Sequence, residues 1–124
     1  MNESSYVRGR NLEDRTLRFA KDVRLFVRNL PKTLSNIEDA KQLIRSSGSI
    51  GANYIEANEA LGKNDFLMRA RISRKEAKEA LYWLQLVTVG SDLEMTRQHQ
   101  YLMKEVNELR AILSKIITNC GGSK

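Results

Sequence analysis

The sequence has 124 residues, 41% of them hydrophobic, so we expect one domain with a buried core rather than a disordered chain. Twenty-one lysines and arginines against fifteen acidic residues leave a net charge of +6, which favours polyanionic partners without reaching the charge density of a histone. One proline and seven glycines favour long helices over a β fold with many turns.

The first predicted element is an amphipathic helix over about residues 12–30, because apolar residues there are spaced by three and four. Asn11 is its expected N-cap, and Pro31 ends it. Residues 1–11 are expected to form a flexible N-terminal arm. The core stripe of this helix is predicted to consist of Leu12, Thr16, Phe19, Val23, Phe26 and Leu30.

A second helix is predicted to begin at a cap on Ser35 or Asn36 and to end near Leu61. Residues 46–53 are its weak point, because each interior glycine costs about 1 kcal/mol relative to alanine, and a loop is the alternative. We favour a continuous helix, since the spacing stays in phase and small side chains allow a neighbouring helix to approach closely. The predicted stripe is Ile37, Ala40, Ile44, Ser47, Gly51, Tyr54, Asn58 and Leu61.

A third helix over about residues 65–89, capped by Asn64 or Asp65, shows two sets of periodic residues. One stripe is Phe66, Ala70, Ser73, Ala77, Leu81, Leu84 and Thr88. A second face, about half a turn away, consists of Met68, Ile72, Glu79, Trp83 and Leu86. In a bundle that does not oligomerise, the solvent-exposed face of each helix should be polar. We therefore interpret this second face as an oligomer interface. Packing in the core is the alternative for Trp83.

The fourth helix is predicted from residue 92 or 93 to 119, and residues 120–124 are expected to fray. Its stripe is Met95, His99, Leu102, Val106, Leu109, Leu113, Ile116 and Cys120. Four long helices with short connections predict an all-α fold, an antiparallel up-down-up-down four-helix bundle over residues 12–119.

The residues needed for known bundle chemistry are missing from the sequence. A di-iron site needs Glu-x-x-His pairs, but His99 is the only histidine and Thr96 stands three positions before it. His99 and Cys120 lie about 30 Å apart along one helix, too far to act as a nucleophile and base. The glutamates, Glu76 and Glu79 included, are expected to point away from the stripes. We therefore expect no enzyme activity, metal or cofactor.

The sequence shows neither an apolar secretory signal near its start nor a run of apolar residues long enough to span a membrane. The single Cys120 excludes an internal disulfide and suits a reducing compartment. A cytoplasmic protein is expected.

The positive charge is concentrated in the first and third helices. Opposite the apolar stripe, the first carries Lys21, Arg24 and Arg28, with Arg18 flanking them. In one sector that ends at Tyr82, the third carries Arg71, Arg74, Lys75 and Lys78. These eight residues are predicted to contact the phosphates of RNA or DNA. The alternatives are a solvated surface or ion pairs between subunits, with Glu56 and Glu59 as partners.

Three segments, Arg45–Asn58, Asp65-Phe66 and Arg74–Leu84, carry a resemblance to a known family. They include the patterns Ser-Ile-x-Ala-Asn-x-x-Glu-Ala and Lys-Glu-Ala-x-Glu-x-x-Tyr-Trp-Leu. Over about residues 12–117 the sequence resembles the four-helix-bundle proteins encoded in intervening sequences of bacterial 23S ribosomal RNA genes. The resemblance implies an antiparallel bundle that forms a homopentameric ring.

That family is also similar to the accessory variability determinant of diversity-generating retroelements, a basic pentameric bundle that binds nucleic acid and a reverse transcriptase. Together with the charge, this resemblance leads us to expect a non-enzymatic oligomer that binds nucleic acid. The alternative function is a structural or adaptor module that binds another protein.

Overall fold

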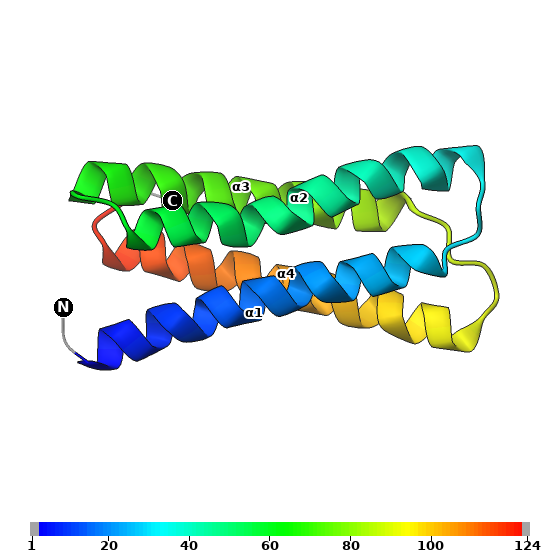
Figure 1. Ribbon diagram of the computed structural model, residues 1–124, viewed down its shortest axis with the longest axis horizontal. Coiled ribbons are helices and arrows are strands. Elements are labelled where there is room, and N and C mark those ends of the chain that lie inside the picture. The colour runs from blue at the N-terminus through cyan, green and yellow to red at the C-terminus, as the bar shows by residue number, and fades with distance from the viewer. Residues whose placement is uncertain (1–2, 123–124) are drawn as a thin grey trace.

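The computed structural model describes the backbone of residues 3–122 and the side chains of residues 11–122. Four helices follow one another: α1 (Glu3–Arg28), α2 (Leu34–Asn58), α3 (Lys63–Leu86) and α4 (Leu93–Asn119). Short connections place consecutive helices side by side in opposite directions (Figure 1), which confirms the predicted four-helix bundle. Within the described backbone, no helix is long and apolar enough to cross a membrane.

Helix α1 begins nine residues before the predicted start at Leu12, because its first residue is Glu3. Residues 3–11 of the expected arm are therefore helical, and Asn11 lies inside the helix rather than at its N-cap. Residues 1–2 of the arm and residues 123–124 of the expected tail lie outside the described backbone. The six residues of the predicted stripe are buried, so this part of the core is confirmed.

Helix α2 is continuous across residues 46–53, as predicted, and its small residues lie where the other helices come closest. A methyl group added to Gly51 would stand 2.8 Å from Oγ1 of Thr16 on α1, well inside van der Waals contact. On the other side, Oγ of Ser73 on α3 donates to the carbonyl oxygen of Ile50 at 2.7 Å. Small side chains thus let α1 and α3 both pack closely against α2.

The buried face of α2 is turned relative to the predicted stripe. It is centred on Leu43, Ile50 and Ala57, whereas Ile37 is 42% exposed and Leu61 lies beyond the helix end in solvent. The prediction was wrong at these two positions because α3, not α1, is the more extensively packed neighbour of α2. The N-cap is also Thr33, whose Oγ1 accepts from N of Asn36 at 3.1 Å.

Helix α3 buries a broad arc, because it packs against both α2 and α4. Leu67 and Ala80 are buried in place of the predicted Phe66 and Leu81, which are only partly buried, and Thr88 is exposed. The helix begins at Lys63 after Gly62, which makes no side-chain capping bond, so the predicted caps at residues 64 and 65 are wrong.

Helix α4 begins after Asp92, whose carboxylate accepts hydrogen bonds from N of Glu94 and N of Met95. His99 has a structural position here. Its Nε2 lies 2.6 Å from the carbonyl oxygen of Leu84, and its ring is parallel to that of Phe26 at 5.7 Å. The histidine therefore fastens the start of α4 to the end of α3 and to α1.

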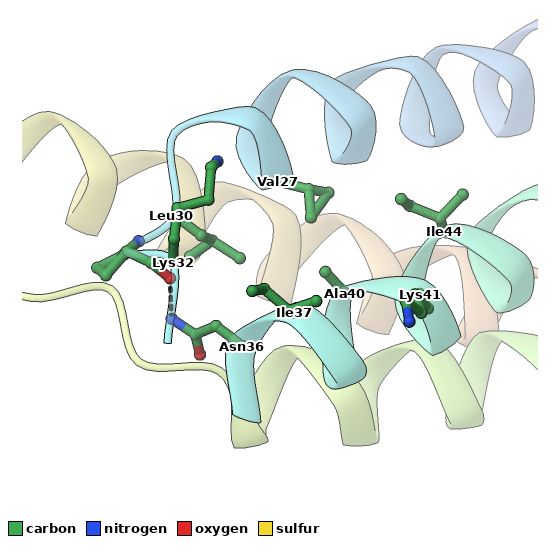
Figure 2. Close-up of a pocket in the computed structure, with 9 residues that line it drawn as sticks. Val27, Leu30, Lys32, Asn36, Ile37, Ala40, Lys41 and Ile44 are labelled. Carbon is green, nitrogen blue, oxygen red and sulfur yellow. Dashed lines mark hydrogen bonds between the residues drawn. The ribbon is translucent and has the colours of Figure 1, made fainter. Parts of the chain in front are cut away.

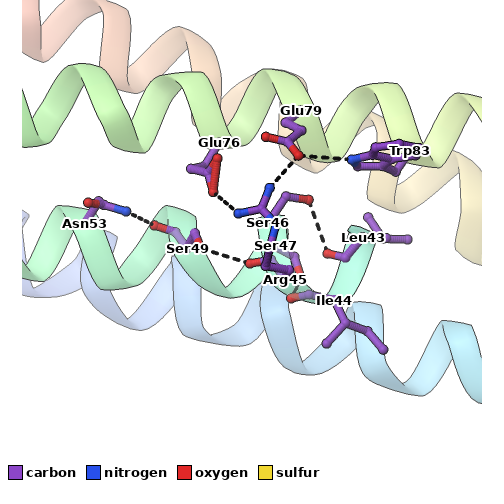
Figure 3. A network of polar contacts seen from close by, with 10 residues as sticks. All are labelled: Leu43, Ile44, Arg45, Ser46, Ser47, Ser49, Asn53, Glu76, Glu79 and Trp83. Carbon is purple, nitrogen blue, oxygen red and sulfur yellow. Dashed lines mark hydrogen bonds and ion pairs between the residues drawn. The ribbon is translucent and has the colours of Figure 1, made fainter. Parts of the chain in front are cut away.

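Two arginines clamp pairs of helices by binding two glutamates each. Arg45 of α2 binds Glu76 and Glu79 of α3 (Figure 3). Arg15 of α1 binds Glu105 at 2.8 Å and Glu108 at 2.6 Å on α4. In each pair the glutamates are three residues apart, so they share one helix face and reach one guanidinium.

The Arg45 clamp overturns the expectation that Glu76 points away from the core, because Glu76 is only 7% exposed. Burial of this carboxylate is sustained by Nη1 of Arg45 at 2.8 Å. The second carboxylate, Glu79, also accepts from Nε1 of Trp83 at 3.3 Å, and the hydrogen bond from Arg45 lowers the pKa of Glu79.

We predict opposite effects of alanine at two glycines of α2. At Gly48 a methyl group meets only Nη2 of Arg24 at 3.6 Å, so Gly48→Ala should raise the free energy of unfolding by about 0.5–1 kcal/mol through helix propensity. Gly51→Ala should lower it by about 1–2 kcal/mol because of the clash with Thr16. Chemical denaturation checks both values, and the cost of Gly51→Ala should shrink in a Thr16→Ala background. Equal effects at the two sites would contradict the close approach.

A second prediction concerns the pH dependence of the Arg45 clamp. Since the folded-state pKa of Glu79 is depressed, its stabilisation is present above the unfolded pKa of about 4.3 and is lost as the pH falls through the folded value. Arg45→Met should cost about 1–2 kcal/mol of unfolding free energy at pH 7 and less at pH 3.

Arg97→Met is the matched control for the clamp, because Arg97 makes a single exposed pair with Glu94 at 3.9 Å. Its cost should stay below about 0.5 kcal/mol at both pH values. An Arg45→Met cost that does not change with pH would show that the carboxylates are not its origin.

Candidate nucleic-acid interface

The cations predicted on the first helix form one surface, which we call the α1 surface. Its members are Arg18, Lys21, Arg24 and Arg28, and all four are exposed. They lie on the side of α1 opposite Phe19, Val23 and Phe26, whose side chains are buried in the core. Ten residues separate the first and last cation, which corresponds to about 15 Å along the helix.

The cations predicted on the third helix form the α3 surface, composed of Arg71, Arg74, Lys75 and Lys78. Three of them are exposed, and the partly buried Arg74 donates to Oγ of Ser114 on α4 at 3.3 Å. Tyr82, one turn after Lys78, is 55% exposed and stands edge-on to the ring of Trp83 at 5.1 Å. An aromatic ring beside cations is a feature of surfaces on which unpaired bases stack.

Ion pairs within the described residues do not neutralise the eight cations of the two surfaces. Among residues 11–122, whose side chains are described, none of the eight forms an ion pair with a carboxylate. On α3, Arg45 binds Glu79, the acidic residue one turn after Lys75, and it also neutralises Glu76. The four α3 cations have no carboxylate partner within the described part of the chain.

The structure does not bring the two surfaces together. Within the described residues the neighbours of α1 are α2 and α4, and the backbones of α1 and α3 are not adjacent, so α1 and α3 occupy diagonal corners of the bundle (Figure 1). Their buried faces both point to the central core, and their exposed faces therefore point away from each other. The eight residues form two separate cationic surfaces rather than one.

The second face of α3, predicted as an oligomer interface, is partly open in the single chain. Met68 and Leu86 are 47% and 46% exposed, while Ile72 and Trp83 are partly buried. Glu79, the remaining member, is bound to Arg45 within its own chain. Four side chains of this face are therefore apolar or aromatic and at least partly exposed, and one of them, Trp83, lies beside the Arg45 clamp (Figure 3).

Two features of the molecule escaped sequence reasoning. The clamps were missed, although glutamates three residues apart on both α3 and α4 were a usable signal. An apolar groove between α1 and α2 was also missed, since three of its residues, Ile37, Ala40 and Ile44, were predicted to be core. Within the described residues, no group of three or more His, Cys, Asp or Glu side chains is placed to hold a metal ion.

Comparisons with known proteins agree on one family. Residues 11–115 match the family model described as 23S rRNA-intervening sequence protein. A crystal structure of a protein of unknown function from the S23 ribosomal protein family of Bacteroides thetaiotaomicron is 32% identical to this chain, with a TM-score of 0.74. The match covers 86% of this chain and 97% of that one. No curated protein matches the sequence. Since the family model covers most of the bundle, the chain belongs to the 23S rRNA-intervening sequence protein family.

Proposed function

We propose that this protein is a non-enzymatic, homo-oligomeric bundle that binds RNA or DNA electrostatically through the α1 and α3 surfaces. One observation carries the proposal: seven exposed cations and the adjacent Arg74 form no ion pair with a described carboxylate, while Glu76 and Glu79, two of the three acidic residues of α3, are neutralised from α2. Each phosphate that such a cation neutralises releases counterions and contributes affinity without regard to base sequence.

A gel-shift titration with a structured RNA and with a DNA duplex tests this function. With about four phosphate contacts, the affinity should fall about 100-fold between 50 and 200 mM salt. No retardation at low salt with either probe, even at high protein concentration, would overturn the proposal.

Charge reversal of the α3 surface distinguishes nucleic-acid binding from an adaptor function. The variant R71E/R74E/K75E/K78E should retain less nucleic acid, because only the α1 surface is left, while the oligomer keeps its size. The opposite result, a changed oligomer with unchanged retention, would assign these residues to ion pairs between subunits, with Glu56 and Glu59 as candidate partners. Circular dichroism should show native helix content, since three of the four residues are exposed.

The groove between α1 and α2 favours an adaptor function as the second candidate (Figure 2). This groove, about 220 Å³ in volume, is lined by Val27, Leu30, Ile37 and Ile44, with Lys41 beside them. An apolar groove on a helical surface is the kind of site in which a partner helix inserts apolar side chains.

The oligomer that we propose is a homopentamer, and its interface includes Met68, Ile72, Glu79, Trp83 and Leu86. Light scattering should then give about five times the subunit mass of 14.2 kDa. Met68→Glu should lower this mass, because it would bury a carboxylate without a partner in the interface. Gln100→Glu, which adds the same charge at an exposed position on α4, is the control. A monomer of the unmodified protein at micromolar concentration would rule out the assembly.

A further inference from the structure

The opposite orientation of the α1 and α3 surfaces limits what one nucleic acid can contact. Neighbouring helices of a bundle pack about 8–10 Å apart, so the axes at diagonal corners lie about 14 Å apart. The cationic side chains extend outward from both of these helices, which adds several ångströms on each side. A straight double helix laid along one surface cannot reach the other.

Bending does not solve this problem for a duplex. Its persistence length is about 150 base pairs, whereas a path from α1 around the bundle to α3 would require it to curl around a body only about 20–25 Å thick. At the α2 corner, such a path would also cross the exposed carboxylates of Glu56 and Glu59, which form no ion pair with a described cation. Two surfaces on one subunit are therefore separate sites for double-stranded nucleic acid.

Each surface is large enough to act alone. The α1 surface places four cations along about 15 Å of helix, and the α3 surface places four along about 10 Å. A duplex carries one negative charge per roughly 1.7 Å of its axis, so either surface can meet several phosphates. Neither surface needs the cations of the other to neutralise the phosphates that it covers.

We infer that each subunit holds two independent duplex-binding surfaces, one on α1 and one on α3, and joins two nucleic-acid segments rather than gripping one. The inference rests on the proposed function, because it takes the two surfaces as phosphate-binding. The subunit is then bivalent, and the segments that it joins are double-stranded, because a duplex cannot wrap around the bundle.

The test is the number of duplexes bound per chain. A fluorescent RNA duplex of ~12 base pairs is titrated with the full-length protein at low salt and at duplex concentrations well above the dissociation constant. The native protein should saturate at two duplexes per chain.

Three variants separate the two surfaces. The α1 variant R18Q/K21Q/R24Q/R28Q and the α3 variant R71Q/R74Q/K75Q/K78Q should each saturate at one duplex per chain. The control K41Q/R97Q/K104Q/K115Q removes the same charge from other exposed positions of α2 and α4 and should still bind two. Thermal unfolding of all variants is followed by circular dichroism. A variant that shows no cooperative unfolding of its helices is replaced by one in which only the two central cations of its surface are substituted.

The outcomes distinguish the inference from the function on which it rests. Saturation of the native protein at one duplex per chain would overturn the inference and leave nucleic-acid binding standing. The inference is also overturned if a variant lacking one surface still binds two duplexes. If the native protein binds no RNA duplex at low salt, the inference fails, and the proposed function fails with it only if the gel shifts with structured RNA and duplex DNA also show no retardation.

Discussion

The close approach of both α1 and α3 to α2 is the constraint on which the rest of the structure depends. Gly51 faces Thr16 with no room for a methyl group, and Ser73 donates to the backbone of α2 through the carbonyl oxygen of Ile50. Side chains this small bury little apolar area, so their contribution is geometric: they set the spacing between helices. That spacing allows Arg45 to reach two glutamates of α3 from the neighbouring helix.

The clamps connect this packing to the electrostatics of the surface. Arg15 and Arg45 each take up two carboxylates, and two of these glutamates, Glu79 and Glu108, stand one turn after a lysine that could otherwise have paired with them. Since Glu76 is nearly buried, a mobile surface lysine could not replace Arg45, whose rigid guanidinium donates to both carboxylates at once. The arginines whose ion pairs hold the bundle together are therefore different residues from the cations that face solvent.

The sequence predicted the bundle well where one apolar stripe dominated and less well where small residues carried the packing. On α1, large residues such as Phe19 and Phe26 mark the core without ambiguity. On α2, serine and glycine occupy the buried face, so Ile37 was mistaken for core although it lies on the open groove beside α1. The cations of the site could be located on exposed helix faces from periodicity alone. That α1 and α3 lie on a diagonal follows from which helices pack as neighbours, and a single-helix pattern does not contain this information.

The solvent-facing cations can change during evolution more freely than the arginines that hold the helices together. Seven of the eight cations are exposed, and no described carboxylate depends on any of the eight for its partner. Changes at these positions therefore leave no buried charge behind, which is the main way in which loss of an arginine destabilises a fold. Arg45 and Arg15 lack this freedom, because each supports carboxylates on another helix. Within one small bundle, the arginines that fix the helices and the cations that face a partner are thus under different constraints, although composition alone does not distinguish them.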